Sequence, residues 1–333
     1  MSGLHPFKTK FLITKGPQTE KGLKKRKVCS AMYIVENFEE LYLSYFANCV
    51  FNAILSYAAI MLNIVTIQAL RKTASLPTVL RTLLLNLAVS DLGVGALVQP
   101  LYVAFVAVRM KDNYKNHDFD GINKAFGILA NFFGYASFYG VTVLSADRFL
   151  AIHLHLRYRE LVTPKRVIAV VVAMWIVSGF SSLLGFRRWS WDTAMIIFVV
   201  NGAVCLTATT FFHYKILAEV RRHSHQIHRL QVAENGKILT RALKIRKYAV
   251  GTFYVYLVLL VCYFPQICVF SVELATGNSA LANHVSLYTL TMILLNSTLN
   301  PLIYCWKMRH VRHAVMSMLL NICRSRSVLV LFS

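Results

Sequence analysis

The stretch Ser145-Ala146-Asp147-Arg148-Phe149-Leu150-Ala151-Ile152 decides how this sequence is interpreted. It closes an apolar run over residues 125–144, and a helix of about 20 such residues crosses the hydrocarbon core of a bilayer. An acid and a base side by side at that boundary need an explanation. An arginine at a helix end can extend to the lipid headgroups and act only as an anchor. The rest of the sequence must therefore show whether Arg148 is only an anchor or belongs to a functional site.

The composition indicates an integral membrane protein. Of the 333 residues, 56% are hydrophobic and only 15% are charged, whereas a soluble protein has about 25% charged residues. The formal net charge of +22 would favour nucleic-acid binding in a soluble protein, but basic residues in membrane proteins gather in cytoplasmic loops. We therefore expect no nucleic-acid partner.

Seven apolar runs are each long enough for a membrane-spanning helix. They cover residues 45–70, 79–108, 125–149, 167–186, 194–217, 248–275 and 281–306. The sequence thus predicts an all-α membrane protein, a seven-transmembrane helix bundle. We expect an N-terminal tail without regular structure over residues 1–44, the bundle over residues 45–306, and an amphipathic helix with a short cytoplasmic tail over residues 307–333.

The charges of the connecting segments predict the orientation of the bundle. The connector between the fifth and sixth runs is densely basic from Lys215 to Lys247, whereas the connectors on the opposite side hold few basic residues. The positive-inside rule places the basic connectors in the cytoplasm. We expect a multi-pass protein of the plasma membrane with its N-terminus outside, although the basic N-terminal tail opposes this orientation.

The segment after the last run has the pattern of a helix that lies on the membrane surface. Apolar residues recur at helical spacing at Met308, Val311, Val315 and Met318 beside a basic face. We expect a short amphipathic eighth helix on the inner leaflet, with membrane lipid as its partner. Cys323 just beyond it is a candidate palmitoylation site.

Four of the predicted helices have polar residues near their midpoints, where the bilayer tolerates them poorly: Asn63, Asp91, Ser137, and Asn296, Ser297 and Asn300. A carboxylate at mid-bilayer costs at least about 2.5–3.5 kcal/mol, so Asp91 should face the interior of the bundle and have partners there. These groups either join helices through hydrogen bonds or provide oxygen ligands for a small cation.

Two prolines lie inside the sixth and seventh runs, Pro265 and Pro301. Each proline removes a backbone hydrogen bond and kinks its helix. The two kinks are candidate hinges, although a kink can also serve packing alone.

In order along the chain, a set of motifs resembles that of the class A (rhodopsin-like) G protein-coupled receptors. These motifs are Leu62 to Val65, Leu87 to Asp91, Asp147-Arg148-Phe149 in place of Asp-Arg-Tyr, Trp175, Tyr214, Cys262 to Pro265 with Tyr263 in place of tryptophan, and Asn300 to Tyr304. The resemblance extends over nearly the whole chain, from the first run to the amphipathic helix. It implies a receptor that binds an extracellular ligand and activates heterotrimeric G proteins.

The resemblance also implies roles for individual residues. The activation switch would consist of Asp147, Arg148, Tyr214, Tyr263, Pro265, Asn300, Pro301 and Tyr304. In it, Asp147 restrains Arg148 at rest, and activation releases Arg148 toward the G protein. A sodium pocket that stabilises inactive receptors would consist of Asp91, Ser137, Asn296 and Asn300.

Departures from the family pattern limit the classes of ligand that this protein is expected to bind. Asn123 replaces the usual cysteine of the third helix and Leu206 replaces the usual proline of the fifth, as in the melanocortin, lysophospholipid, cannabinoid and adenosine receptor group. Ala130 replaces the aspartate that pairs with amine ligands. What remains is a mostly apolar ligand pocket around Tyr102, Ala130, Phe133, Tyr263, Val269, Glu273 and Tyr288. We expect a small apolar or weakly polar ligand, while a peptide remains an alternative.

Two other functional classes, a transporter or ion pump and an intramembrane enzyme, have less support in the sequence than a receptor. A seven-helix transporter or ion pump has only the midplane Asp91 in its favour, because the sequence lacks a chain of intramembrane acids and inverted repeats. An intramembrane enzyme would need a motif such as GxSxG or HExxH, and none is present. We therefore expect no enzymatic activity and no cofactor other than an allosteric sodium ion.

Overall fold

The computed structural model describes residues 20–73, 76–110, 117–154, 157–187, 191–232, 236–277, 279–308 and 311–317. The chain divides into two compact units, Met1–Ala47 and Asn48–Ser333. In the first unit the backbone is helical from Glu20, where α1 (Glu20–Lys72) begins. Residues 20–44, for which we expected a tail without regular structure, are therefore helical. No proline or glycine interrupts the sequence from Leu23 to Lys72, so nothing breaks the helix before the apolar run.

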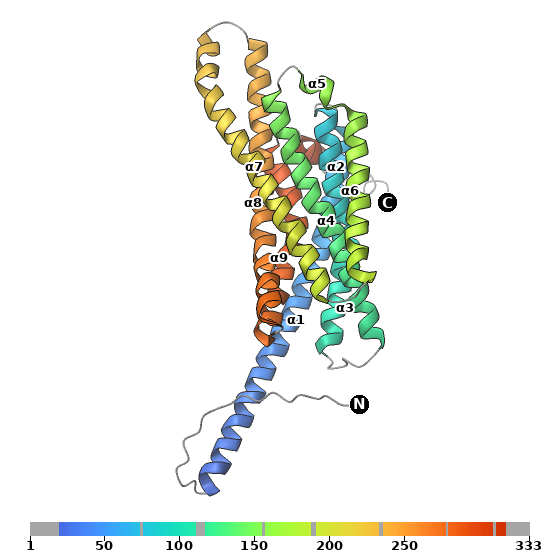
Figure 1. The fold of residues 1–333 in the computed structure, drawn as a ribbon, viewed down its shortest axis with the longest axis vertical. Helices are drawn as coiled ribbons and strands as arrows, with labels where there is room; N and C mark the ends of the chain where they lie inside the picture. Colours follow the sequence, from blue (N-terminus) through green and yellow to red (C-terminus); the bar gives the residue numbers. More distant parts are fainter. Residues whose placement is uncertain are drawn as a thin grey trace, which may run out of the picture. The chain divides into compact units, whose positions relative to one another are not determined.

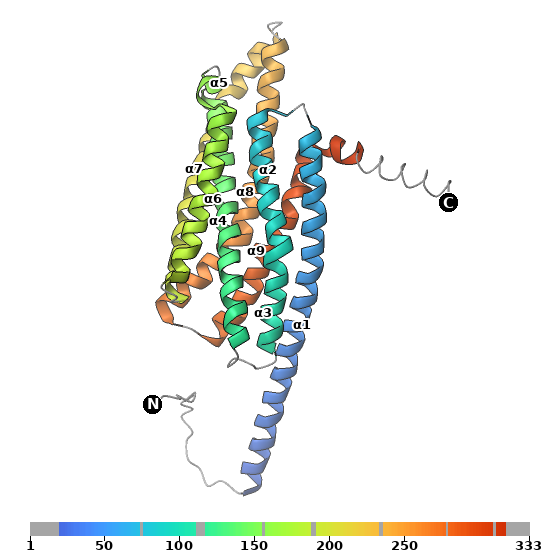
Figure 2. The ribbon, with the colours of Figure 1, turned by 90° about the vertical axis from the view of Figure 1, so that its right-hand side faces the viewer.

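The second unit is a bundle of helices, in agreement with the predicted all-α fold (Figures 1 and 2). After α1 its elements are α2 (Thr78–Gly93), the π-helical turn η1 (Val94–Val98), α3 (Gln99–Met110), α4 (His117–His153), α5 (Tyr158–Leu161), α6 (Pro164–Arg187), α7 (Trp191–Val232), α8 (Gly236–Thr276) and α9 (Ala280–Lys307). Each predicted span lies within a helix, except that the second comprises α2, η1 and α3. Residues 311–317 are helical as well, within the predicted amphipathic segment.

Among the described residues, six helical segments are long and apolar enough to cross a membrane. They are Tyr42–Lys72, Thr78–Met110, Gly121–His153, Pro164–Leu184, Asp192–Arg221 and Tyr248–Thr276. The seventh predicted span, α9, has sufficient length at 28 residues but a more polar sequence. Its polar side chains are buried, so they face the surrounding helices and not lipid. They are Thr291, Asn296, Ser297 and Asn300.

Hydrogen bonds between side chains and neighbouring helices fix the packing of the bundle. Trp175 on α6 donates from Nε1 to Oδ1 of Asn86 on α2 over 2.8 Å. Asn63 on α1 donates from Nδ2 to the carbonyl of Ser297 on α9 over 3.0 Å. Because lipid provides no hydrogen-bond partners, such pairs hold buried polar groups and helices in place together.

The second span changes its helical geometry just before Pro100. Proline lacks the N–H that an α-helix would use at this position. The chain adopts the wider π-helical turn η1 instead, in which the N–H of Gln99 donates to the carbonyl of Val94, five residues earlier. The sequence analysis did not predict this turn.

A turn of defined geometry lies between the last two long helices. Gly277 follows α8 with a φ angle of 84°, a conformation that glycine adopts without steric strain. Ser279 then caps α9, because its Oγ accepts a hydrogen bond of 3.1 Å from the N–H of Ala282. Along their lengths α8 and α9 pack against each other.

Candidate functional site

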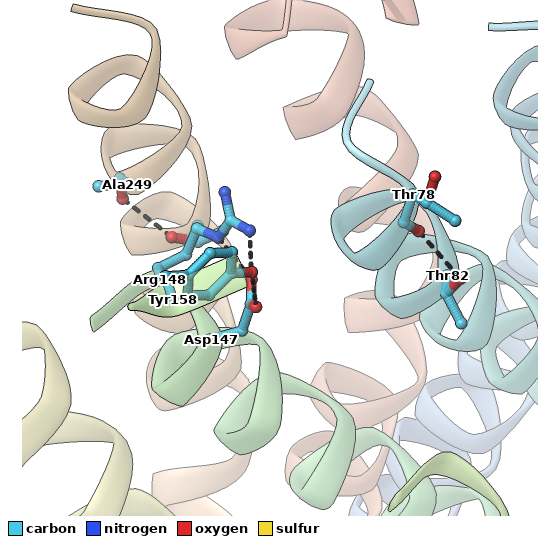
Figure 3. Close-up of polar contacts among 7 residues, drawn as sticks. Thr78, Thr82, Asp147, Arg148, Tyr158 and Ala249 are labelled. Atoms are coloured by element: carbon cyan, nitrogen blue, oxygen red, sulfur yellow. Dashed lines mark hydrogen bonds and ion pairs between the residues drawn. The ribbon is translucent and has the colours of Figure 1, made fainter. Parts of the chain in front are cut away.

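The acid and base of the opening stretch form a buried ion pair at the end of α4 (Figure 3). Arg148 donates from Nε to Oδ2 of Asp147 over 2.8 Å, and its Nη2 contacts the same oxygen. The exposed fractions are only 3% for Arg148 and 4% for Asp147. An anchor that extends to the headgroups would be exposed, so the burial argues against the anchor interpretation.

A third residue, which the sequence analysis did not predict, contacts the acid of this ion pair. Tyr158 on α5 donates its hydroxyl to Oδ1 of Asp147 over 2.5 Å, so both carboxylate oxygens are occupied (Figure 3). Burial and the adjacent Asp147 raise the pKa of Tyr158, which keeps the phenol protonated as a donor. The sequence offered no signal for it, since Tyr158 lies in a basic connector eleven residues after Asp147.

A second buried polar contact lies close to the ion pair and joins α4, α7 and α8. Ser145 donates its hydroxyl to the carbonyl of Val141 over 2.8 Å, and its Oγ lies 3.0 Å from Nε2 of His213. The tautomer of His213 decides which of these two atoms is the donor. The His213 ring stacks on Tyr256 of α8 at 4.8 Å between centroids. Three helices are thus fixed together one turn from Arg148.

The midplane polar residues form the second part of the candidate site. Asp91 accepts a hydrogen bond of 2.9 Å at Oδ2 from Nδ2 of Asn300. Each of the four predicted sodium ligands has a buried oxygen without a hydrogen-bond partner among the described residues: Oδ1 of Asp91, Oγ of Ser137, Oδ1 of Asn296 and Oδ1 of Asn300. One carboxylate with several neutral oxygens is a donor set that a small hard cation uses. The residues present therefore fit a sodium ion.

The remaining switch residues fall into two groups in the structure. Tyr263 and Tyr304 are buried, with the Tyr263 ring 4.4 Å from that of Phe138, and Pro265 and Pro301 interrupt the interiors of α8 and α9. Tyr214, in contrast, is 67% exposed. The structure therefore does not bring Tyr214 together with the buried tyrosines.

Two of the predicted ligand-pocket residues, Tyr102 and Phe133, make different kinds of contact in the structure. Tyr102 is buried and donates its hydroxyl to the carbonyl of Leu287 on α9 over 2.9 Å. Phe133 instead packs edge-on against Trp175 of α6, at 6.0 Å between centroids, and beside Gly93 of α2. A Cβ at Gly93 would lie 2.1 Å from the Phe133 ring, so this glycine creates the space that the ring fills. Phe133 thus belongs to the packing between helices.

The other pocket residues differ in exposure. Glu273 is buried, Ala130 and Val269 are half-buried, and Tyr288 is 51% exposed. The ligand assignments remain predictions. The candidate lipidation site Cys323 lies outside the described residues.

Residues 62–194 match the family model of the 7 transmembrane receptor (rhodopsin family). The match supports a rhodopsin-like receptor. It extends from α1 to the start of α7 and includes Asp91, Ser137 and the Asp147–Arg148 pair. Rhodopsin-like receptors are multi-pass membrane proteins of the G protein-coupled type, in agreement with the bundle and its membrane-spanning helices.

Proposed function

We propose that this protein is a plasma-membrane G protein-coupled receptor, which binds an extracellular ligand and activates heterotrimeric G proteins. The observation that supports this most directly is the buried Asp147–Arg148 pair with Tyr158 on its second carboxylate oxygen. The attraction within this pair is strongest while the surroundings exclude water, whereas water screens the two charges and hydrates each of them separately. The pair therefore provides two alternative states for Arg148, paired inside the bundle or released to an intracellular partner.

Ligand binding acts on this pair as a population shift. A ligand that prefers the released state draws the ensemble toward it by its difference in affinity for the two states. Pro265 inside α8 and Pro301 inside α9 would allow the two helices to bend during this change, since each proline frees a carbonyl from the helical hydrogen-bond pattern. Tyr263 lies beside Phe138 in the core and would connect the ligand pocket to the bend in α8.

Sodium acts as an allosteric inhibitor in this proposal. Asp91, Ser137, Asn296 and Asn300 would hold the ion, which supplies a positive charge for the otherwise uncompensated carboxylate. With the ion bound, these residues would connect α2, α4 and α9 and so favour the resting arrangement. We assign the ligand to the small apolar or weakly polar class, and the receptor to the melanocortin, lysophospholipid, cannabinoid and adenosine group, on the sequence pattern alone.

The orientation and the membrane attachment complete the proposal. The N-terminus lies outside the cell, and the basic segment from Lys215 to Lys247, at the end of α7 and the start of α8, faces the cytoplasm, where it meets the G protein and anionic lipid. The helical segment 311–317 would lie on the inner leaflet, with palmitoyl-Cys323 as a second anchor.

The decisive experiment measures guanine-nucleotide exchange by purified G proteins with the full-length receptor in lipid nanodiscs, screened against a panel of ligands. The variant Arg148→Ala should abolish agonist-dependent exchange. Arg71→Ala, which removes an exposed arginine at the end of α1, is the matched control and should retain it. Full agonist-dependent exchange by Arg148→Ala would refute the role of Arg148, and ion currents without exchange would favour a transporter or pump.

A further inference from the structure

A groove of about 640 Å³ opens between α7 and α8 on the outside of the bundle. It is lined on α7 by Ala203, Leu206, Thr207, Thr210, Phe211 and Tyr214, and on α8 by Leu260, Phe264 and Ile267. Both helices belong to the membrane-spanning segments, and Phe211, Tyr214 and Phe264 are each more than half exposed. The groove therefore opens toward the hydrocarbon of the bilayer.

The lining offers almost no hydrogen-bonding groups to an occupant. The Thr207 hydroxyl donates to the carbonyl of Ala203 over 2.7 Å, and that of Thr210 donates to the carbonyl of Leu206 over 2.6 Å. The Thr210 oxygen also has a second hydrogen-bond partner, the hydroxyl of the buried Tyr256 at 2.7 Å. Since both threonine hydroxyls have local partners, the groove is chemically a surface of methyl groups and aromatic rings apart from the Tyr214 hydroxyl at the end nearest Arg221, and such a surface suits a hydrocarbon chain.

The length and position of the groove match one leaflet. From Ala203 to Tyr214 the α7 backbone rises about 16 Å at 1.5 Å per residue, and half of the hydrocarbon core of a bilayer is about 15 Å thick. The span Asp192–Arg221 has its midpoint near Leu206, so the groove extends from the midplane toward the Arg221 end. In the orientation proposed above, on which this inference depends, that end is cytoplasmic.

Positive charge lies at the same end of the groove. Lys215 directly follows the lining residue Tyr214, and Arg221 lies less than two helical turns further; both side chains are exposed. The Lys215 ammonium lies 5.4 Å from the centroid of the Phe211 ring, so it is positioned over one wall of the groove. Since the cytoplasmic leaflet contains the anionic lipids of a plasma membrane, a headgroup at this level meets complementary charge.

We propose that the groove between α7 and α8 binds an anionic phospholipid of the inner leaflet, with one acyl chain along Ala203 to Tyr214 and its headgroup at Lys215 and Arg221. The chain contacts Phe264 and Ile267, which flank Pro265 on α8. The lipid thus touches both sides of the proposed hinge and favours the conformation in which the groove exists. The site is distinct from the ligand pocket and from the midplane sodium site.

The test uses the full-length receptor in nanodiscs with two photoactivatable probes, phosphatidylserine and phosphatidylcholine, each with a diazirine in the same acyl chain. Mass spectrometry of the labelled peptides identifies the sites. The phosphatidylserine probe should label the groove segments of α7 and α8 about fivefold more than the phosphatidylcholine probe, the ratio expected when one basic residue near the surface contributes about 1 kcal/mol. Equal labelling by the two probes would refute a specific lipid site.

Three variants separate the parts of the proposal. Thr207→Trp fills the groove and should reduce its labelling at least threefold, whereas Val172→Trp, at an exposed position on α6, should leave it unchanged. Lys215→Gln should remove the preference for phosphatidylserine while acyl-chain labelling persists. An equal effect of both tryptophans would identify the labelling as ordinary lipid contact. Because labelling needs no agonist or G protein, the site can hold even if the receptor function proposed above is refuted.

Discussion

Replacing Tyr158 by phenylalanine removes one hydroxyl and tests how firmly Arg148 is held at rest. The hydroxyl donates to Oδ1 of Asp147, and a hydrogen bond to a charged group contributes about 1.5–3 kcal/mol. If the bond exists only in the resting state, its loss shifts the equilibrium toward the released state by about 10- to 150-fold, since 1.4 kcal/mol is a factor of ten. An active fraction of about 0.1% without ligand would rise to between about 1% and 13%.

The assay is ligand-free guanine-nucleotide exchange by purified G protein in the presence of the Tyr158→Phe variant, compared at equal concentration with the unsubstituted protein. Tyr57→Phe is the matched control, because it removes a tyrosine hydroxyl from an exposed position on α1 and should leave basal exchange unchanged. Thermal unfolding of both variants distinguishes a shifted equilibrium from general destabilisation. Unchanged or lower basal exchange in Tyr158→Phe, in a folded receptor, would show that this contact does not restrain Arg148.

Three further predictions concern the buried polar and packing contacts. Asp91→Asn should abolish the rise in thermal stability on exchanging choline chloride for sodium chloride, and a sodium effect that persists would place the ion elsewhere. Ser145→Ala leaves the buried Nε2 of His213 without its hydrogen-bond partner and should lower the free energy of unfolding by about 1–3 kcal/mol, measured by denaturation in detergent; no change would mean that water replaces the hydroxyl. Gly93→Ala forces a Cβ against the Phe133 ring and should destabilise by about 1–3 kcal/mol, whereas Gly134→Ala, with nothing within 4 Å of the added Cβ, should be neutral or stabilising.

The long apolar segments were predictable because a bilayer imposes a minimum length on them. Each predicted run lies in a helix, and the prolines at positions 265 and 301 lie inside α8 and α9 as the sequence indicates. Asp91 was predictable for a related reason, since a carboxylate at that depth has to face protein and not lipid. Its burial and its bond to Asn300 agree with that expectation.

Side-chain direction and irregular backbone were harder to predict. Tyr214 and His213 are neighbours and both polar, yet His213 is buried and Tyr214 is exposed, which depends on how α7 is rotated in the bundle. The direction of Phe133 also depends on packing. Its ring lies between Trp175 of α6 and Gly93 of α2, and the space beside Gly93 exists only once the helices are packed. Tyr158 reaches Asp147 through the fold of a short connector, and apolar periodicity carries no information about such a contact.

The polarity of α9 has a consequence for how the protein is made. A helix with buried Thr291, Asn296, Ser297 and Asn300 gains less from lipid than the six more apolar segments do, so it inserts poorly by itself. Its partners α1, α2 and α8 precede it in the chain, and α8 ends only four residues before it begins. We therefore expect that α9 inserts into the membrane only together with the helices that precede it. Damage to the α8–α9 packing should appear first as protein that fails quality control during biosynthesis, before any loss of signalling is measured.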